Sequence, residues 1–488
     1  MKFRNFLATI LLLGLVSARG EVKLNGLFTD GAVLQQGIAV PVWGTARAGE
    51  KVTVVFQDQE VSTVAQEGRW SVRLKSPKAG GPFTLTVRGD NSITLTNVLV
   101  GEVWLCSGQS NMGFKLSRAD TADAAIAAAG DAQLRLFTVS RESDDTPRTD
   151  VTGHWQESTP VTASNFSAVA YFFGRDLRRA LKVPVALIDS SVGGTPAEAW
   201  TSRGALEADP ELQPILAQYQ AKVRHFDSDV AKRKQAAADA KAKGENTPPA
   251  AKAAANPARS PQRPTGLYNA MIAPLQPYAL KGVIWYQGEA NSGRAEQYQK
   301  LFPAMIKDWR TAWGQGDFPF LFVQIAPHER MTPEIREAQF LTAQRVTATA
   351  VIVTTDVGEA KDIHPKKKEP VGGRLALAAR ALAYGEKLEY SGPMFDALKL
   401  EGARAILSFT HVGGGLEARG GELKGFSVAG ADRKFVSATA KIEGDKVVLA
   451  AAAVSQPEVV RYGWEFVPDV NLFNRAGLPA SPFRTDRQ

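Results

Sequence analysis

VWLCSGQSNM, residues 103–112, is the stretch that decides the fold of this chain. Its first four residues form a short apolar run, and the Ser, Gly and Asn residues behind them favour turns. Such a run predicts a buried strand that ends in a loop. In an open parallel sheet the carboxyl ends of the strands form the edge where sites are built, so we expect Ser110 to lie at a site.

Apolar runs of the same kind recur along the chain and alternate with stretches of helical spacing. The helical patterns lie around residues 172–181 and 334–346. This alternation predicts an α/β domain over residues 99–388 with a mostly parallel sheet. The other predicted strands are residues 185–188, 283–286, 320–323 and 350–353.

Two regions of short alternating strands flank this domain. Residues 21–98 contain runs such as VTVVF at 52–56, broken by Gly, Asp and Asn, which predict a small β-sandwich. The alternation returns over residues 389–488, with Gly-rich turns, and predicts a second β-rich domain. A chain of 488 residues agrees with several domains, because single cores rarely grow beyond about 250–300 residues.

The N-terminus has the layout of a secretory signal peptide over residues 1–20. Two basic residues precede an apolar run at residues 6–16, and small residues follow it, so we expect cleavage after Ala18 or Gly20. The mature protein is then periplasmic or secreted. No later stretch reaches the roughly 20 apolar residues of a membrane span, so we expect no membrane contact after cleavage. Cys106 is the only cysteine, which excludes an intrachain disulfide.

An Ala-, Lys- and Arg-rich insertion interrupts the α/β domain at about residues 212–263. Its composition predicts an exposed helix followed by a linker, and it carries much of the basic excess behind the formal charge of +8. Nucleic-acid binding is disfavoured, because such binders interleave aromatic residues with basic ones, and the insertion offers little beyond Tyr219 and Phe226. We expect a peripheral, solvated segment whose replacement leaves the hydrolysis of a small acetyl ester nearly unchanged. The alternative is a lid that shelters the site and helps to position a long sugar chain.

Four polar clusters follow predicted strands, and we expect them to converge at one sheet edge. A hydroxyl nucleophile needs a base that takes its proton and donors that stabilise the oxyanion. Ser110 supplies the hydroxyl, although Ser after a strand is also an ordinary turn or helix-capping residue. The clusters are residues 107–112, 189–195, 287–291 and 356–365.

His364 is the best-placed base among the five histidines, with His328 in reserve. Pro365 disfavours the helical conformation at His364, and side chains two apart in an extended segment project to the same side. Asp362 can therefore orient the imidazole ring. Asp356, closer to the strand end, is the alternative, and either Asp also fits a turn-capping role.

The loop around Ser110 differs from the Gly-x-Ser-x-Gly elbow of α/β-hydrolases, because Met112 stands where the second Gly belongs. Four motifs point instead to another group: GQSNM at 108–112, GGTPAEAW at 193–200, WYQGEAN at 285–291 and DIHPK at 362–366. In this order and spacing they resemble the sialate O-acetylesterase family of SGNH-type hydrolases. The likeness continues through the C-terminal tail and covers nearly all of the mature chain.

This resemblance implies an SGNH-hydrolase-like, three-layer α/β domain flanked by small β-sandwich-type domains. It implies a serine esterase that removes acetyl groups from sugar hydroxyls, with no metal and no organic cofactor. By position, Ser110 is the nucleophile and His364 the general base. The oxyanion hole would use the backbone N–H of Ser110, the N–H groups of the Gly193–Gly194 loop and the side chain of Gln287.

The sequence does not decide which carboxylate supports His364 as the third member of a Ser–His–acid triad. Many SGNH enzymes have Asp three residues before the His, where this chain has Lys361, so both Asp362 and Asp356 remain candidates. For Trp200, core packing is at least as strong an expectation as sugar contact, because large rings are mostly buried. The expected substrate contacts are Glu289, Asn291, Arg294 and Trp200.

Acetylated sialic acid is the substrate that the resemblance favours, and the partner is in any case an acetylated sugar or glycan. One alternative is a deacetylase of plant polysaccharides such as xylan or pectin. A sialic acid carboxylate would require an Arg or Lys fork in the pocket. A non-catalytic carbohydrate-binding protein is the alternative from another class, but it has no need of Ser, His and an oxyanion donor after three strands. The sequence carries no signal for an oligomeric state.

Overall fold

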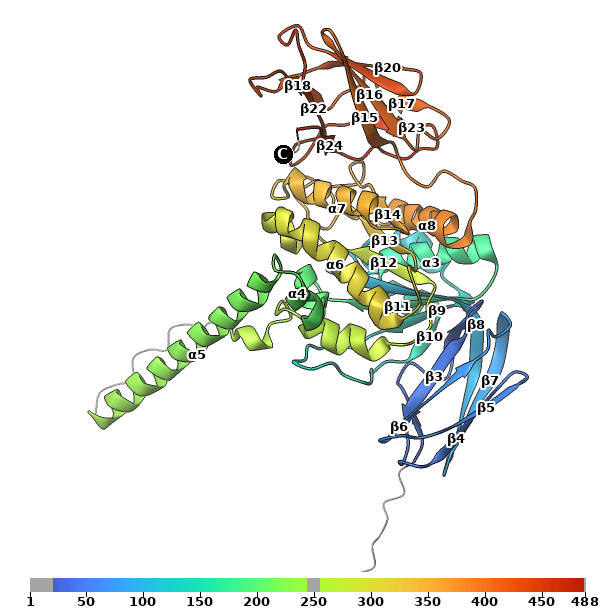
Figure 1. Cartoon of the computed structure of the whole chain (residues 1–488). Helices are drawn as coiled ribbons and strands as arrows, with labels where there is room; N and C mark the ends of the chain where they lie inside the picture. The colour runs from blue at the N-terminus through green and yellow to red at the C-terminus, as the bar shows by residue number, and fades with distance from the viewer. Residues whose placement is uncertain (1–20, 244–254, 487–488) are drawn as a thin grey trace, which may run out of the picture.

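The structure is a computed structural model that describes residues 21–243 and 255–486 (Figure 1). The predicted signal peptide and part of the predicted linker lie outside the described residues. The central sheet has the order β10-β9-β11-β8-β12-β13-β14, and only the pairing of β10 with β9 is antiparallel. Its strands are β10 (Trp155–Ser158), β9 (Asp131–Thr138), β11 (Val185–Ser191), β8 (Ser92–Gly108), β12 (Gly282–Tyr286), β13 (Phe320–Val323) and β14 (Thr349–Ile352).

All five strands predicted for the sheet are present, and the mostly parallel α/β architecture is confirmed. The sequence analysis missed β9 and β10. In β9, Arg135 interrupts the apolar run, although it is 3% exposed and its guanidinium donates to Asn97 and pairs with Glu157. The buried charge of Arg135, whose partners lie far away in the sequence, therefore hid the apolar pattern of this core strand.

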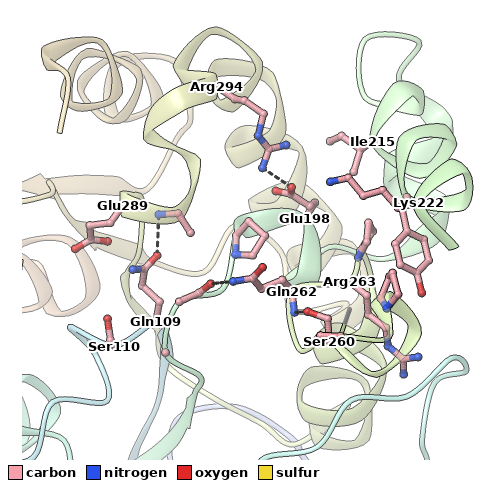
Figure 2. A pocket seen from close by; sticks show the side chains of 18 of the residues that line it. Gln109, Ser110, Glu198, Ile215, Lys222, Ser260, Gln262, Arg263, Glu289 and Arg294 are labelled. Carbon is pink, nitrogen blue, oxygen red and sulfur yellow. Dashed lines mark hydrogen bonds and ion pairs between the residues drawn. The ribbon is translucent and has the colours of Figure 1, made fainter. Parts of the chain in front are cut away.

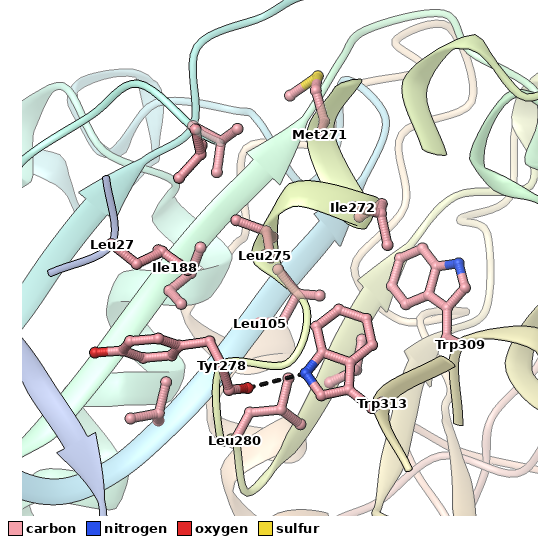
Figure 3. Packing of buried hydrophobic residues seen from close by; sticks show 14 of the residues in the cluster. Leu27, Leu105, Ile188, Met271, Ile272, Leu275, Tyr278, Leu280, Trp309 and Trp313 are labelled. Atoms are coloured by element: carbon pink, nitrogen blue, oxygen red, sulfur yellow. Dashed lines mark hydrogen bonds between the residues drawn. The ribbon is translucent and has the colours of Figure 1, made fainter. Parts of the chain in front are cut away.

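Helices cover both faces of this sheet (Figure 1). Successive strand residues point to opposite faces, so Trp104 and Cys106 pack in one hydrophobic cluster and Val103 and Leu105 in another. Figure 3 shows part of the second cluster, where the indole N–H of Trp313 donates to a backbone carbonyl at 2.9 Å. The first cluster includes residues of α3 (Ala168–Leu181) and α8 (Glu369–Tyr384), and the second includes residues of α6 (Ala295–Trp313) and α7 (Pro333–Arg345).

The N-terminal strands form two facing sheets with a shared core. β6 (Arg69–Leu74) buries every second residue, as the alternating sequence predicts. β8 continues without interruption from Ser92 to Gly108, so the predicted boundary at residue 98 falls inside one strand. The other strands here are β1 (Lys23–Leu24), β2 (Val33–Gln35), β3 (Val40–Thr45), β4 (Lys51–Phe56), β5 (Gln59–Val64) and β7 (Gly80–Arg88).

The C-terminal region forms three small sheets around its own core. β16 (Arg404–Thr410) buries Ala405, Leu407 and Phe409 on one face, which is the period-2 pattern expected for a half-buried strand. The remaining strands are β15 (Met394–Glu401), β17 (Leu416–Ala418), β18 (Phe426–Ala429), β19 (Val436–Ser437), β20 (Thr439–Glu443), β21 (Lys446–Ala450), β22 (Val459–Tyr462), β23 (Leu472–Asn474) and β24 (Phe483–Arg484).

The insertion contains one long helix, α5 (Gln213–Ala242), which projects away from the rest of the molecule (Figure 1). The predicted exposed helix is thus confirmed. It follows the short α4 (Arg203–Ala208), and the 3-10 turn η3 (Pro257–Arg259) lies in the returning segment. None of the described helices is both long and apolar enough to cross a bilayer.

Candidate active site

The loop that carries Ser110 begins at a glycine that no other residue can replace without strain. Gly108 has a φ of 137°, and a Cβ there would lie 2.2 Å from the carbonyl oxygen of Tyr286 on the neighbouring strand β12. The backbone N–H of Gln109 donates to that same carbonyl, and the carbonyl of Gln109 accepts from the N–H groups of Met112 and Gly113. This tight turn directs Ser110 out of the sheet edge.

The loop after β14 brings His364 to Ser110. The Nε2 of His364 lies 2.8 Å from the Oγ of Ser110, a hydrogen bond between residues 254 positions apart. The amide of Asn111 donates to the carbonyl of Ile363 at 2.9 Å and so ties the two loops together beside this contact. The structure therefore unites the hydroxyl and the imidazole that the sequence analysis had singled out.

The two candidate orienting acids occupy different environments. The Oδ1 of Asp362 accepts from the backbone N–H of His364 at 2.9 Å and lies 3.9 Å from the Nδ1 of its ring, beyond hydrogen-bond distance. Both oxygens of Asp356 bind the guanidinium of Arg374 instead. Asp362 is thus the carboxylate next to the imidazole, and the alternative assignment to Asp356 has no support in the geometry.

The environment of His364 favours the neutral form of its imidazole. Burial lowers the pKa of its imidazole, and the charges of Lys368 and Arg118 lower it further, while Asp362 opposes them. The neutral imidazole can accept the proton of Ser110, and the surroundings of the ring extend this neutral form to lower pH.

Gly193 lies against Ser110. A Cβ at Gly193 would be 3.4 Å from the Cβ of Ser110, so a small residue keeps the loop after β11 close to the hydroxyl. Across the residues that the structure describes, the backbone N–H groups of Ser110, Gly193 and Gly194 have no protein acceptor. The geometry leaves these donors available to an oxyanion.

Gln287 does not present a free donor. Its side-chain NH₂ donates to the carbonyl of Thr195 at 3.2 Å and to the Oδ1 of Asn291 at 2.7 Å, and the residue is fully buried. Both amide hydrogens are therefore used inside the protein. The sequence-based assignment of Gln287 to the oxyanion hole is wrong for this conformation, because the motif reveals the residue type but not which groups surround its amide.

Ser110 and His364 open into a cavity of about 850 Å³. Figure 2 shows Ser110 and Glu289 on one side of it and the insertion residues Ile215 and Lys222 on the other. The returning segment, residues 255–264, also contributes, and the amide of Gln262 donates to the carbonyl of Gly194 at 2.9 Å. The expectation of a peripheral insertion is therefore wrong, because both of its ends line the cavity that contains Ser110 and His364.

The four expected substrate contacts divide into two pairs. Glu289 and Arg294 line the cavity. Asn291 is 1% exposed and lies behind the wall, where it binds Gln287 and Glu198. Trp200 is fully buried and its indole donates to a threonine hydroxyl, so its assignment as a sugar contact is wrong. A large ring contributes more by packing in the core than at the cavity surface.

Several residues in or behind the cavity wall escaped the sequence analysis. The carboxylate of Glu198 forms an ion pair with Arg294 at 2.6 Å, and its motif position was the only signal for it. Arg263 is 7% exposed and donates to Asp145, and Lys368 is fully buried behind the nucleophile. Arg263 and Lys368 stand in basic stretches that resemble solvated charge runs, so no local signal distinguished them.

No group of three or more His, Cys, Asp or Glu side chains in residues 21–243 and 255–486 is arranged to hold a metal ion. A sequence model of the carbohydrate esterase family described as sialic acid-specific acetylesterase matches residues 249–380.

Curated and solved relatives agree with that match. The chain is 31% identical to the sialate O-acetylesterase of Rattus norvegicus, over 91% of this chain and 90% of the relative. It is 33% identical to the sialate O-acetylesterase of Mus musculus, over 76% of this chain and 75% of that one. Among solved structures it is similar to a carbohydrate acetylesterase from Xanthomonas citri, with 40% identity, a TM-score of 0.83 and coverage of 96% and 100% of the two chains.

The fold, the site and these relatives define a carboxylic ester hydrolase that acts on carbohydrate. The coverage and identity then decide the family. The chain belongs to the sialate O-acetylesterase family.

Proposed function

We propose that this enzyme is an SGNH-type serine esterase that removes O-acetyl groups from sugars, with acetylated sialic acid as the favoured substrate, through an acetyl-enzyme intermediate. The observation that carries the proposal is the 2.8 Å contact between the Nε2 of His364 and the Oγ of Ser110 at the cavity. A positioned base within hydrogen-bond distance is what a serine nucleophile requires.

The reaction would follow the acyl-transfer scheme. His364 takes the proton of Ser110, whose oxygen attacks the acetyl carbonyl, and the N–H groups of Ser110, Gly193 and Gly194 are the donors we assign to the oxyanion. Collapse of the tetrahedral intermediate breaks the ester bond, and His364 returns the proton to the departing sugar oxygen. Water, activated by His364, then attacks the acetyl group on Ser110 and releases acetate.

We assign Asp362 to support His364. Its carboxylate already bonds the backbone N–H of His364, and it lies 3.9 Å from the Nδ1. Such hydrogen bonds are often long in the absence of substrate and shorten in the reactive complex. A carboxylate here would favour the ring tautomer that leaves Nε2 free to accept a proton.

Cationic side chains at the cavity support a substrate that carries a carboxylate. Lys222 reaches the cavity from α5 and is without an ion-pair partner in the described part of the chain. Arg294 is a second cationic side chain at the cavity, although its guanidinium already pairs with Glu198. Charge-assisted hydrogen bonds to carboxylates are among the strong polar contacts, so these residues suit an acidic sugar such as sialic acid.

A deacetylase of plant polysaccharides such as xylan or pectin is the second candidate. A neighbouring cavity of about 630 Å³ is lined by Arg263, which also lines the first, so the two lie side by side. Two adjoining hollows would suit a chain of sugars more than one monosaccharide. We further propose that the enzyme is exported after cleavage of residues 1–20. Its proposed domains are residues 21–98, 99–388 and 389–488, with β8 continuing from the first domain into the second.

Acetate release from a panel of substrates tests the proposal. Acetylated sialic acid should exceed acetylated xylan and pectin fragments in kcat/KM, and a serine-directed phosphonate should label Ser110 alone. Preference for xylan or pectin would select the second candidate. Acetate release without labelling of Ser110 would refute the serine mechanism, and binding of acetylated sugars without any acetate release would indicate a carbohydrate-binding protein.

A further inference from the structure

Lys368 is a fully buried lysine beneath the nucleophile loop. It stands directly before α8, four positions after His364, and its Nζ donates to the Oδ1 of Asn111 at 2.6 Å. Its ammonium also lies 4.9 Å and 5.1 Å from the ring centroids of Phe114 and Tyr286. Burial of a charged amine is costly, so this arrangement needs a function that offsets the cost.

Asn111 links Lys368 to both catalytic loops. Its amide oxygen accepts from Lys368, while its NH₂ donates to the Oε1 of Glu289 at 2.6 Å and to the carbonyl of Ile363 at 2.9 Å. Asn111 follows Ser110 in the chain, and Ile363 precedes His364. An ammonium can only donate, so Lys368 fixes which way the amide of Asn111 points. The amide then holds both loops at their separation.

The charge of Lys368 also acts on the imidazole. Burial lowers the pKa of Lys368 to about 7, and the acidic groups that face it, Glu289, Asp362 and Glu359, oppose that shift, while Arg118 adds to it. Burial raises the pKa of Glu289, whose Oε2 has no partner in the described structure. Below neutral pH the protonated Lys368 is therefore a positive charge close to His364.

We propose that Lys368 is a positioning residue of the active site: through Asn111 it sets the distance between Ser110 and His364, and its positive charge keeps the imidazole unprotonated. This inference rests on the proposed serine esterase function. Lys368 itself touches neither the substrate nor the reacting atoms. It acts in two ways: its hydrogen bond to Asn111 positions the two loops, and its charge acts on the imidazole of His364.

Two substitutions separate these contributions. Lys368→Met removes both the donor and the charge, and Lys368→Gln keeps an N–H donor, on a side chain one bond shorter, without the charge. With a small aryl acetate, Lys368→Met should lower kcat by about 10- to 100-fold with KM within about 3-fold, because misplaced catalytic groups slow the chemical step more than binding. Lys368→Gln should recover part of that loss.

The pH profile is the readout that a merely structural role would not change. Loss of the positive charge makes protonation of His364 easier, so the acid limb of kcat/KM should move to higher pH in both variants. The matched control is Lys367→Met, which removes the exposed neighbouring lysine and should keep the kcat and the acid limb of the unmodified enzyme.

The results distinguish this inference from the proposed function. Unchanged kcat and an unmoved acid limb in the Lys368 variants, while Ser110→Ala is inactive, would overturn the positioning role alone. Loss of folding in both variants, measured by thermal unfolding, would show that Lys368 serves stability only. A lower kcat with an unmoved acid limb in the folded variants would overturn the contribution of its charge. If Ser110→Ala retains activity, the serine mechanism fails and this inference fails with it.

Discussion

The two sides of the cavity are built in different ways. The catalytic side consists of the loops after β8, β11 and β14, and its residue Asn111 is completely buried and bonded on every polar atom of its side chain. The insertion side consists of α5 and residues 255–264. Of the 30 residues in α5, only Ile215, Leu216 and Ala240 are buried.

This difference separates chemistry from recognition. The proton transfer that we propose between Ser110 and His364 would tolerate little displacement, and strand ends held by long-range hydrogen bonds supply that precision. A projecting helix with few buried side chains cannot hold a reacting group as firmly, but it can enclose a bulky sugar. We therefore expect substitutions on the catalytic side to change kcat and those on the insertion side to change KM.

The largest effect is expected on the catalytic side. Ser110→Ala should lower kcat by roughly three to six orders of magnitude, because the acyl-enzyme route needs the hydroxyl and only the oxyanion donors remain. The measurement is acetate release from an aryl acetate, and thermal unfolding should show an intact fold. Near-normal turnover in the folded variant would contradict the assignment of the chemistry to the catalytic side of the cavity.

The orienting carboxylate should give the next largest effect. Asp362→Asn should lower kcat by about 10- to 100-fold, because the amide favours the wrong ring tautomer of His364. Asp356→Asn should lower kcat less and should mainly reduce stability, since Asp356 binds Arg374. Steady-state kinetics and urea unfolding of both variants test this ranking, and a larger kcat loss in Asp356→Asn would exchange the two roles.

The insertion side should change recognition with little effect on chemistry. Replacement of residues 220–258 by a short Gly/Ser linker removes Lys222 and part of the returning wall. KM for an acetylated oligosaccharide should rise by about 10-fold, while kcat for a small aryl acetate should stay within about 3-fold, because the lost contacts serve binding in the ground and transition states alike. A large kcat loss on the aryl acetate would mean that this wall shapes the reaction centre itself.

A single substitution sharpens the same prediction. Lys222→Ala should raise KM for acetylated sialic acid by roughly 3- to 10-fold through loss of a cation at the cavity. Lys232→Ala, an exposed lysine ten positions further along α5, is the matched control and should leave KM unchanged. Equal effects of both substitutions would assign the insertion only a diffuse electrostatic role.

The smallest effect concerns stability. Burial raises the pKa of Asp189, on β11, to about 6, although the Ser191 hydroxyl donates to it at 2.7 Å. The folded pKa lies above the unfolded one, so the stabilisation is complete below about pH 4 and is lost as pH rises through 6. Asp189→Asn keeps an acceptor for Ser191 and should add about 2–3 kcal/mol to the free energy of unfolding at pH 8.

Urea unfolding at two pH values tests this prediction. At pH 4 the substitution should change the free energy of unfolding by much less than at pH 8, because Asp189 is then protonated in the folded state. The control is Asp227→Asn on the exposed surface of α5, which should have little effect at either pH. An equal gain at both pH values would exclude the buried charge as the cause.

Much of this organisation was predictable because its signals are local. In several strands of the central sheet, the apolar run and the polar loop that follows it lie close together in the sequence. These local patterns predict that the loops carrying Ser110 and His364 lie at one edge of the sheet. The alternation in the flanking regions likewise predicted β-structure. Arg135 obscured β9, because its buried charge breaks the apolar run and its partners lie far away in the sequence.

The sequence by itself thus determined the fold class, the nucleophile and base as candidates, and the exposed helix of the insertion. Only the tertiary structure decided that Gln287 uses its amide inside the protein and that residues 255–264 return to the cavity. It alone brought Lys368 to Asn111, across 257 positions. The physical reason is that secondary structure follows patterns within a few residues, whereas burial and hydrogen-bond partners depend on which distant segments pack together.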